Sequence, residues 1–379
     1  MNHLHFIWKN MVRNRRRTVL TILSIALSLF VLATLMTVLT ELNREPEGED
    51  AHLRLVVRRA SSLGDRLPEA YGAKLARVPG VRTVTTLTWF GGIYIDEANF
   101  FASFACDPDT LLPMYPEVRI PPEQFKAFQK ERTAAFAGRK LFERFKWRLG
   151  DRITLQGTIY PVDLEFVLRG INTGTDETAF FFHRAYLEES LGRPGKVGTF
   201  WLKAASAADI PRIMDTVDTM FKNSDAETKT ETERAFQLGF VSMMGNVKTL
   251  VAGISSVVVF TILLVTANTM AMSIRERARE IAILKTLGFG RRRLLAILMA
   301  ESAAIALIGG ALGTVGARLF FSVVDVWRYT QGMFPIFIVE PSTILLGLLL
   351  SIVIGLASAA FPAFRVSHLT IAEALRRVG

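Results

Sequence analysis

The sequence predicts an α-helical membrane protein in which four transmembrane helices carry a large extracytoplasmic α+β domain. Half of the 379 residues are hydrophobic, and they cluster into long runs instead of alternating with polar residues. The basic residues outside the central region are concentrated in three short segments, which is typical of a protein that crosses a membrane several times.

Four segments are long enough to span a bilayer, which requires roughly 20 apolar residues in a helix. We expect these spans at 18–40, 249–274, 300–324 and 341–364, and all but the third are free of charge. The third contains Glu301 and Arg318, which lie about 25 Å apart along a helix. We expect both to reach toward opposite interfaces as anchors, and a proton or ion site is the alternative.

The distribution of charge predicts the topology. The net charge is +10, yet residues 41–248 hold 28 Lys and Arg against 29 Asp and Glu. Most of the remaining basic residues lie in 1–17, 275–293 and 365–379, which the positive-inside rule places in the cytoplasm. Residues 41–248 are then extracytoplasmic, and 325–340 form a short external loop. The positive net charge is therefore explained by the topology of the chain in the lipid bilayer, and nucleic-acid binding is not needed to account for it.

The sequence therefore predicts a multi-pass protein of the bacterial inner membrane with both termini in the cytoplasm. Residues 1–17 are expected to form an amphipathic interfacial helix, because Leu4, Ile7, Trp8 and Met11 share one face. The first apolar run is too long for a signal peptide, which favours an uncleaved anchor. The single cysteine, Cys106, is expected to be buried and inert, with a reactive thiol as the alternative.

The extracytoplasmic region reads as two β-α-β halves, in a porter-like arrangement, with a mainly β lobe inserted at about 107–195. Strands are expected at 53–59, 79–92, 197–204 and 225–232, and helices at 67–78 and 208–221. Residues 232–248 permit a helix that would extend the second span outward as a stiff stalk, with Gly239 and Gly245 as weak positions.

Two spans carry small residues at every fourth position, which permits close packing between helices. In the third span these residues are Gly309, Gly313 and Ala317, and in the fourth they are Gly347, Ser351, Gly355 and Ala359. The pattern leaves open whether the stripes pack within one chain or across a dimer. Alternatively, small residues are simply common in membrane helices.

The segment "SIRERAREIAILKTLGFGRRR", residues 273–293, places many charges between two apolar runs. Opposite charges at i, i+3 alternate with like charges at i, i+4, and an apolar ridge runs through Ile281 and Leu284. Glycines at 288 and 290 would then end the helix. The segment reads as a short amphipathic element at the cytoplasmic face. A solvated loop would explain the arginines, but neither Glu276 and Glu280 nor the ridge.

The same segment closely resembles the signature of MacB/FtsX-type ABC transporter permeases, which carry E-R-x-R-E-I followed by a glycine between their second and third spans. "WKNMVRNRRRTVLTILSIALSL", "VPGVRTV", "LGDRITL" and "FPAFRVSHLTIAEALRRV" match the family in order, so the resemblance covers essentially the whole chain. It implies a permease of the mechanotransmission kind. By this resemblance the element that couples to an ATPase comprises Arg275, Glu276, Arg277, Arg279, Glu280, Ile281, Leu284, Lys285 and Gly288.

MacB contains a fused ATPase, whereas this sequence has no G-x-x-x-x-G-K-[ST] segment. The resemblance then implies a separate ABC ATPase subunit that uses ATP and Mg²⁺, a second permease copy or paralogue that completes a dimer, and a periplasmic adaptor in some family members. The chain itself is expected to bind no cofactor or metal and to contain no catalytic residues, since its five histidines show no ligand spacing.

These features predict a permease that drives export or extraction of a substrate from the periplasm or outer leaflet. The alternative is a signal relay, in which the same motion activates an extracytoplasmic partner such as a cell-wall hydrolase.

Overall fold

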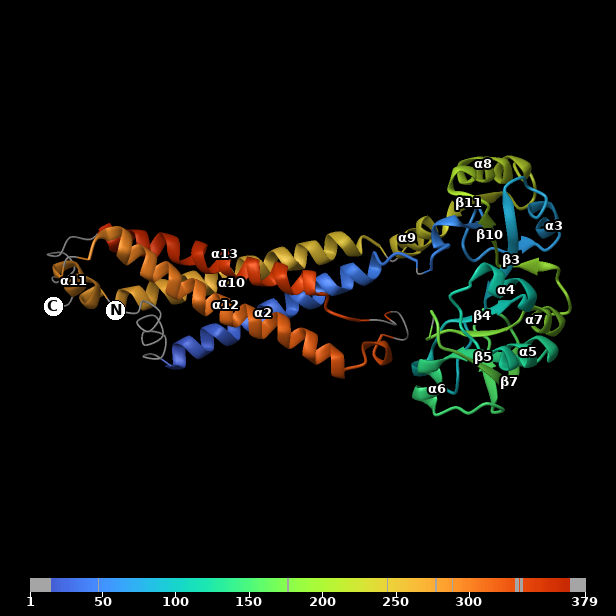
Figure 1. Ribbon diagram of the computed structural model, residues 1–379, viewed down its shortest axis with the longest axis horizontal. Coiled ribbons are helices and arrows are strands. Elements are labelled where there is room, and N and C mark those ends of the chain that lie inside the picture. Colours follow the sequence, from blue (N-terminus) through green and yellow to red (C-terminus); the bar gives the residue numbers. More distant parts are fainter. Residues whose placement is uncertain are drawn as a thin grey trace. The chain divides into compact units, whose positions relative to one another are not determined.

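The computed structural model describes residues 15–368, except for 47, 176, 244, 277, 288, 331–333, 335 and 336. The chain forms two compact units (Figure 1). The helical unit comprises Met1–Leu42, Asn246–Asp325 and Phe337–Gly379, and the α/β unit comprises Asn43–Gly245 and Val326–Ile336. The predicted interfacial helix lies outside the described residues apart from 15–17, as does the tail beyond 368.

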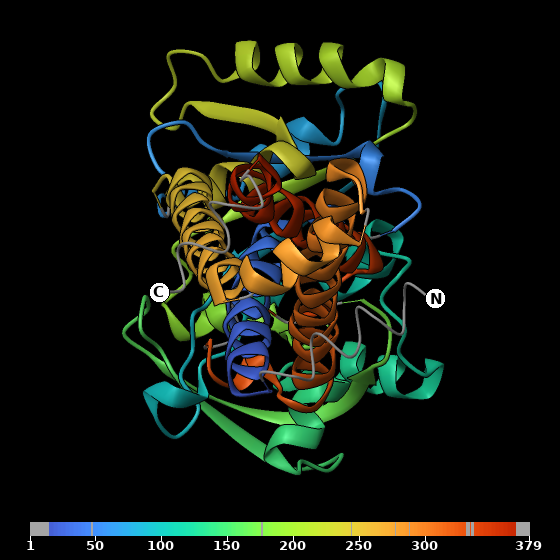
Figure 2. The same ribbon diagram turned by 90° about the vertical axis from the view of Figure 1, so that its left-hand side faces the viewer.

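Four long helices make up most of the helical unit: α2 (Arg15–Leu42), α10 (Val247–Glu276), α12 (Arg291–Val323) and α13 (Pro341–His368). All four are long and apolar enough to cross a membrane, which confirms the predicted fold class. Figure 2 looks nearly along their axes. Helices α10 and α12 each pack against both α2 and α13. The short helix α11 (Ala278–Thr286) connects α10 to α12.

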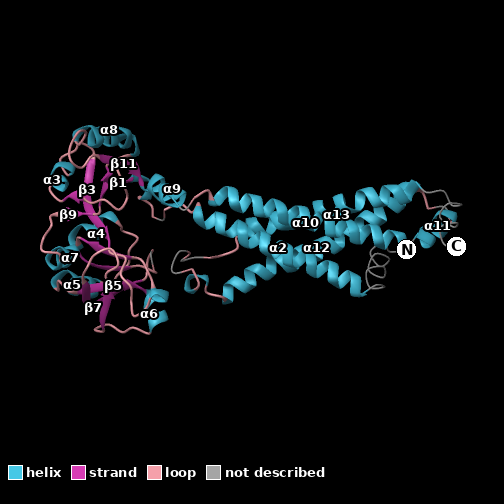
Figure 3. Ribbon diagram, turned by 180° about the vertical axis from the view of Figure 1, so that it is seen from behind, coloured by secondary structure: helices cyan, strands magenta, loops and turns pink. Residues whose placement is uncertain are grey.

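All strands belong to the α/β unit (Figure 3). One nine-stranded sheet has the order β11-β1-β10-β3-β4-β8-β5-β7-β6, and β2 pairs separately with β9. The pairs β4–β8 and β5–β7 are parallel, and the others are antiparallel. The strands are β1 (Arg54–Arg59), β2 (Leu67–Pro68), β3 (Val81–Trp89), β4 (Ser103–Cys106), β5 (Ala134–Gly138), β6 (Arg152–Gln156), β7 (Asp163–Asn172), β8 (Phe180–His183), β9 (Lys196–Val197), β10 (Thr199–Ala204) and β11 (Thr228–Thr232).

Short helices cover both faces of this sheet. They are η1 (Ala51–Leu53), α3 (Tyr71–Leu75), η2 (Glu97–Asn99), α4 (Pro108–Met114), α5 (Pro122–Lys130), α6 (Arg139–Phe145), α7 (Arg184–Ser190), η3 (Ala207–Asp209), α8 (Ile210–Met220), α9 (Glu233–Met243) and η4 (Val326–Arg328). Successive side chains of a strand point to opposite faces of the sheet, so one sheet contributes to a hydrophobic core on each side. Phe180 and Phe182 enter the core that α6 and α7 cover, whereas Phe181 enters the core formed with α4 and α5.

The strands β1, β3, β10 and β11 and the helix α8 lie where the sequence predicts them. The prediction of a mainly β lobe is wrong in part, because residues 107–195 also form α4, α5, α6 and α7. Two of these helices begin at prolines, Pro108 and Pro122, which suit the first turn of a helix although they also signal turns. The lobe is also not separate, because β4 joins its strands to β3 in one sheet.

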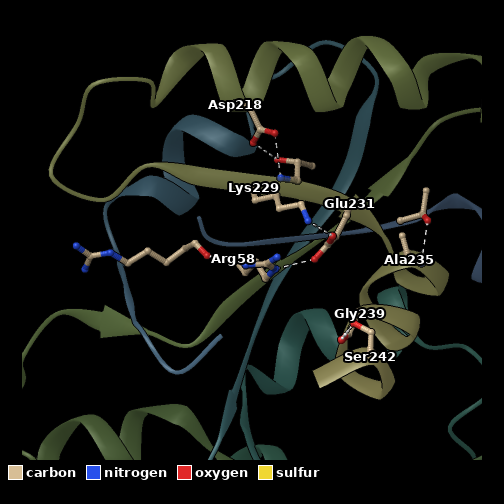
Figure 4. Close-up of polar contacts among 10 residues, drawn as sticks. Arg58, Asp218, Lys229, Glu231, Ala235, Gly239 and Ser242 are labelled. Atoms are coloured by element: carbon tan, nitrogen blue, oxygen red, sulfur yellow. Dashed lines mark hydrogen bonds and ion pairs between the residues drawn. The ribbon is translucent and has the colours of Figure 1, made fainter. Parts of the chain in front are cut away.

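The base of the α/β unit is held by buried charge. Arg54, at the start of β1, forms ion pairs with Glu233, at the start of α9, and with Glu117, in the loop between α4 and α5. The strand β11 is fixed by Glu231, which accepts from Arg58 and Lys229, and by Asp218, which accepts from Thr230 (Figure 4). These contacts join β1, near the start of residues 43–245, to β11 and α9, near their end.

The predicted continuous stalk is wrong. Helix α9 ends at Met243 and α10 begins at Val247, and between them Gly245 has a φ of +88°. A glycine tolerates this left-handed backbone, which no α-helix contains. Gly239, the other weak position, lies within α9. The link between α9 and α10 is therefore a turn and not a continuous helix.

Candidate functional site

The helix α11 is the centre of the candidate site because it joins two spans and carries the charged segment. After it, Gly290 has an extended backbone and is the N-cap of α12. Arg275 and Glu276 end α10, and Arg279, Glu280, Ile281, Leu284 and Lys285 lie in α11. Arg277 and Gly288 lie outside the described residues.

One face of α11 packs against the ends of the membrane helices. Ile281 is only 6% exposed, and Leu284 is partly buried beside it. Their neighbours are Ile274 of α10, Leu294 and Leu298 of α12, and Ala363 of α13. Because this small core includes three long helices, a displacement of α11 must move or repack their ends.

The other face of α11 presents apolar side chains to solvent. Leu287, directly after the helix, is 70% exposed, and Ile283 is half exposed. Arg291, Arg292 and Arg293, which follow Leu287 closely in the sequence, are also exposed. Exposed aliphatic residues bordered by charge are typical of a surface that binds another protein.

Two electrostatic contacts shape the site. Glu276 forms an ion pair with Arg17 in the first turn of α2, 259 residues earlier in the chain. This pair links the beginning of the first long helix to the end of the second. At the other end of α11, partial burial lowers the pKa of Lys285, and the positive charge of Arg291 lowers it further.

The sequence therefore predicts the apolar ridge of α11 but not which of its apolar side chains are buried within the chain. Ile281 and Leu284 are packing residues within the chain, whereas the surface that remains available consists of Ile283, Leu287 and the adjacent arginines. Helical periodicity distinguishes the two faces but not which one is buried, because both are apolar. No sequence signal identifies Arg17 as the partner of Glu276.

The small-residue stripes pack inside the chain. A side chain added at Gly313 would collide with the carbonyl oxygen of Ala26 on α2, and one at Gly309 would lie 2.8 Å from Ile25. A Cβ at Gly355 would lie 2.8 Å from Ala306 of α12, and Gly347 faces Thr314 of the same helix. Ser351 lies against Gly310, and Ala317 and Ala359 are buried. These stripes thus bring α2, α12 and α13 together in one copy.

The two charges of the third span have different surroundings. Arg318 donates a hydrogen bond to the carbonyl of Val339, just before α13. Glu301 is buried on the packed face of α12, next to Ser302, which donates to the Gly355 carbonyl. The expectation that Glu301 reaches outward to an interface as an anchor is therefore wrong, because its side chain is buried within the helical unit. Among the described residues, no group of three His, Cys, Asp or Glu side chains could hold a metal ion.

Residues 252–371 match the family model of the FtsX-like permease C-terminal domain, so this part of the chain is an FtsX-like permease domain. It contains α11 and nearly all of the three later spans.

The homologues are ABC transporter permeases. Over 98% of its length, the chain is 24% identical to the ABC transporter permease MJ1507 of Methanocaldococcus jannaschii, of which 96% is covered. It is 27% identical to the macrolide export ATP-binding/permease protein MacB of Bdellovibrio bacteriovorus, over 46% of this chain and 27% of MacB. Among solved structures, the extracellular domain of the ABC-type transporter YknZ from Gram-positive bacteria has a TM-score of 0.37 and 12% identity, over 47% of this chain and 99% of that domain.

Proposed function

We propose that this chain is the permease subunit of an ABC transporter and relays movement from a separate ATPase subunit to its α/β unit. ATP and Mg²⁺ are used by that ATPase and not by this chain. The α/β unit then drives export or extraction of a substrate from the periplasm or the outer leaflet. The protein acts in the inner membrane of a bacterial cell, with α11 and both termini on the cytoplasmic side.

The observation that supports this proposal best is the two-sided character of α11. Ile281 and Leu284 attach the helix to the ends of α10, α12 and α13, while Ile283 and Leu287 remain exposed. An ATPase bound to the exposed pair would therefore push on the membrane helices through the buried pair. A passive connecting loop would need neither face.

The interior of the helical unit supports movement of the α/β unit over passage through a channel. Buried hydroxyl groups such as those of Thr21, Thr37 and Thr266 donate to carbonyls of their own helices, four residues earlier. These three hydroxyls are thereby satisfied without water or substrate, whereas the buried hydroxyl of Ser255 on α10 has no partner among the described residues. The proposal includes a second copy or a paralogue as the partner in a dimer, and a periplasmic adaptor as a further component.

The test is ATP turnover by the companion ATPase, co-purified with the permease and measured with Ile283→Ser and Leu287→Ser variants. Truncating an apolar residue at the centre of an interface costs about 1–2 kcal/mol, so stimulated turnover at limiting permease should fall roughly tenfold. Glu280→Lys, which reverses a charge on the same helix, should abolish the stimulation.

Met220→Ser provides the matched control, since Met220 is an exposed apolar residue of the α/β unit. It should leave turnover unchanged. The proposal is wrong if the α11 variants remain folded and stimulate the ATPase as well as the parent protein does.

A further inference from the structure

A charged cavity lies within the α/β unit, bordered by α7 and by the short strands β2 and β9. Its volume is about 280 Å³, close to the lower end of the range for cavities that bind small ligands, roughly 300–1,000 Å³. Most ligand cavities are lined mainly by apolar side chains, so a ligand of this one should itself be charged. The charged residues of the lining are Glu69, Arg132, Arg184, Glu188, Glu189 and Arg193.

The side chains around Glu189 carry an excess of positive charge. Arg132, in the loop between α5 and β5, and Arg193, just after α7, both form ion pairs with Oε1 of Glu189. Two guanidinium groups thus share one carboxylate, which leaves one positive charge without a counter-charge. Arg132 is 56% exposed and Arg193 is 76% exposed, so both can turn toward a ligand without disturbing the core.

The side chains around Gly195, which precedes β9, carry an excess of negative charge. The carboxylate of Glu188 accepts a hydrogen bond from the N–H of Gly195 at 3.2 Å, and the carbonyl oxygen of Gly195 accepts one from the N–H of Glu69 at 2.9 Å. Arg184 forms ion pairs with Glu69 at 2.9 Å and with Asp107 at 2.8 Å. Among the described residues Glu188 forms no ion pair, so three carboxylates share one guanidinium group here.

The two groups of charge face different directions. Glu188 and Glu189 follow one another on α7, so their side chains point about 100° apart around the helix. Stabilisation of the fold does not account for this arrangement, because exposed ion pairs contribute little to stability and Glu188 has no cation to pair with.

We infer that this cavity binds a zwitterion, with its ammonium group toward Glu188 and its carboxylate or phosphate toward Arg132 and Arg193. Guanidinium groups form strong, directional hydrogen bonds with both kinds of anion. A ligand with a single charge would match only one of the two groups. Free amino acids, short peptides and the head group of phosphatidylethanolamine all carry the required pair of charges. The site does not depend on the proposed coupling to an ATPase.

Isothermal titration calorimetry on the full-length protein in non-ionic detergent micelles tests the site with two zwitterions, glycylglycine and glycerophosphoethanolamine. At least one of them should bind. Ethanolamine and acetate carry one charge each and should bind roughly tenfold more weakly at the same pH and low ionic strength, because each loses one charged contact. Tighter binding of glycerophosphoethanolamine would identify a lipid head group as the ligand, and tighter binding of glycylglycine would identify a peptide.

Two variants each remove one of the matching charges. Glu188→Gln and Arg193→Gln should both weaken binding of the zwitterion about tenfold, because each deletes a hydrogen bond between charged groups. Arg152→Gln is the matched control. Arg152 also forms an ion pair with an exposed carboxylate, that of Glu165 at 2.7 Å, but it does not line the cavity. The affinity should not change in this variant.

The inference is overturned if neither zwitterion binds, if ethanolamine or acetate binds as tightly as the zwitterions, or if Arg193→Gln retains the parent affinity. The melting temperature shows whether each variant is folded. Should Glu188→Gln be destabilised, Arg193→Gln decides the question, since its parent side chain is mostly exposed. The measurement contains no ATPase, so failure would remove this site and leave the proposed coupling function standing.

Discussion

At the scale of single residues, the approach of the membrane helices depends on glycine. Gly313 faces the backbone of α2 so closely that one methyl group would collide with Ala26, whereas Gly316, one turn later on α12, has no neighbour within 4 Å of its Cβ position. Gly313→Ala should destabilise the protein by about 1–3 kcal/mol through overpacking. The melting temperature in detergent micelles measures this effect.

Gly316→Ala is the matched control in the same helix. It should be neutral or stabilise the protein by about 1 kcal/mol, because alanine favours the helix more than glycine does. Equal melting temperatures for the two variants would show that α2 and α12 do not pack through Gly313.

His183, at the end of β8, makes the stability of the α/β unit sensitive to pH. Its Nε2–H donates to the carbonyl oxygen of Phe128 at 2.6 Å, and burial lowers the pKa of the imidazole below its usual value despite that hydrogen bond. The unfolded chain, with a His pKa of about 6.5, therefore binds a proton more readily than the folded protein. Stability from His183 is fully present above about pH 6.5 and is lost as the pH falls toward the lowered folded value.

The substitution His183→Gln keeps a donor for Phe128 but cannot titrate. The decrease in melting temperature between about pH 7.5 and about pH 5.5 should therefore be smaller in this variant than in the parent protein. His52→Gln removes an exposed histidine and should retain the parent's decrease. The same decrease in all three proteins would contradict the role of His183.

At the scale of elements, α11 has one face packed within the chain and one exposed face, which we propose binds the ATPase. Ile281→Ala removes buried atoms from the small core at the ends of α10, α12 and α13, and it should cost about 2–4 kcal/mol. Ile283→Ala acts on the exposed face and should change stability by less than about 0.5 kcal/mol. Thermal unfolding of the two purified variants distinguishes these faces, and equal losses would contradict the orientation of α11.

The sequence was sufficient to predict the long helices and several strands, because their signals are local. Runs without charge identify α2, α10 and α13, and short apolar runs that contain β-branched or aromatic residues identify β1 and β10 as strands. The short helices α4 and α5 were not predicted. Each begins at a proline, and proline is common in turns as well as in the first turn of a helix. The sequence indicated Gly245 only as a weak position in a possible helix. It could not predict the break there, because a glycine permits a left-handed backbone without requiring one.

The candidate site was predicted in position but not in its contacts. The charges of 275–285 marked the segment, yet packing against Leu294, Leu298 and Ala363 decided that Ile281 is internal and Leu287 exposed. Contacts between distant segments, such as Arg17 with Glu276 and Arg54 with Glu233, have no local signature.

At the scale of the whole molecule, the chain forms two compact units, and the proposed function requires movement to pass from one to the other. The helical unit contains α11, the proposed site for the ATPase, and the α/β unit is held together by one continuous sheet and the buried charges around Arg54. The chain passes between the units near residues 42–43, 245–246, 325–326 and 336–337. The proposed function requires α11 and the α/β unit to lie on opposite sides of the membrane.

Cysteine labelling in intact cells tests this requirement most directly. Cys106 is the only cysteine, and burial, aided by the charge of Asp107, raises the pKa of its thiol, so it stays protonated and unreactive. In a Cys106→Ser background, a membrane-impermeant maleimide should label Lys126→Cys in intact cells and Leu287→Cys only after permeabilisation. Labelling of Leu287→Cys from outside intact cells would contradict the account.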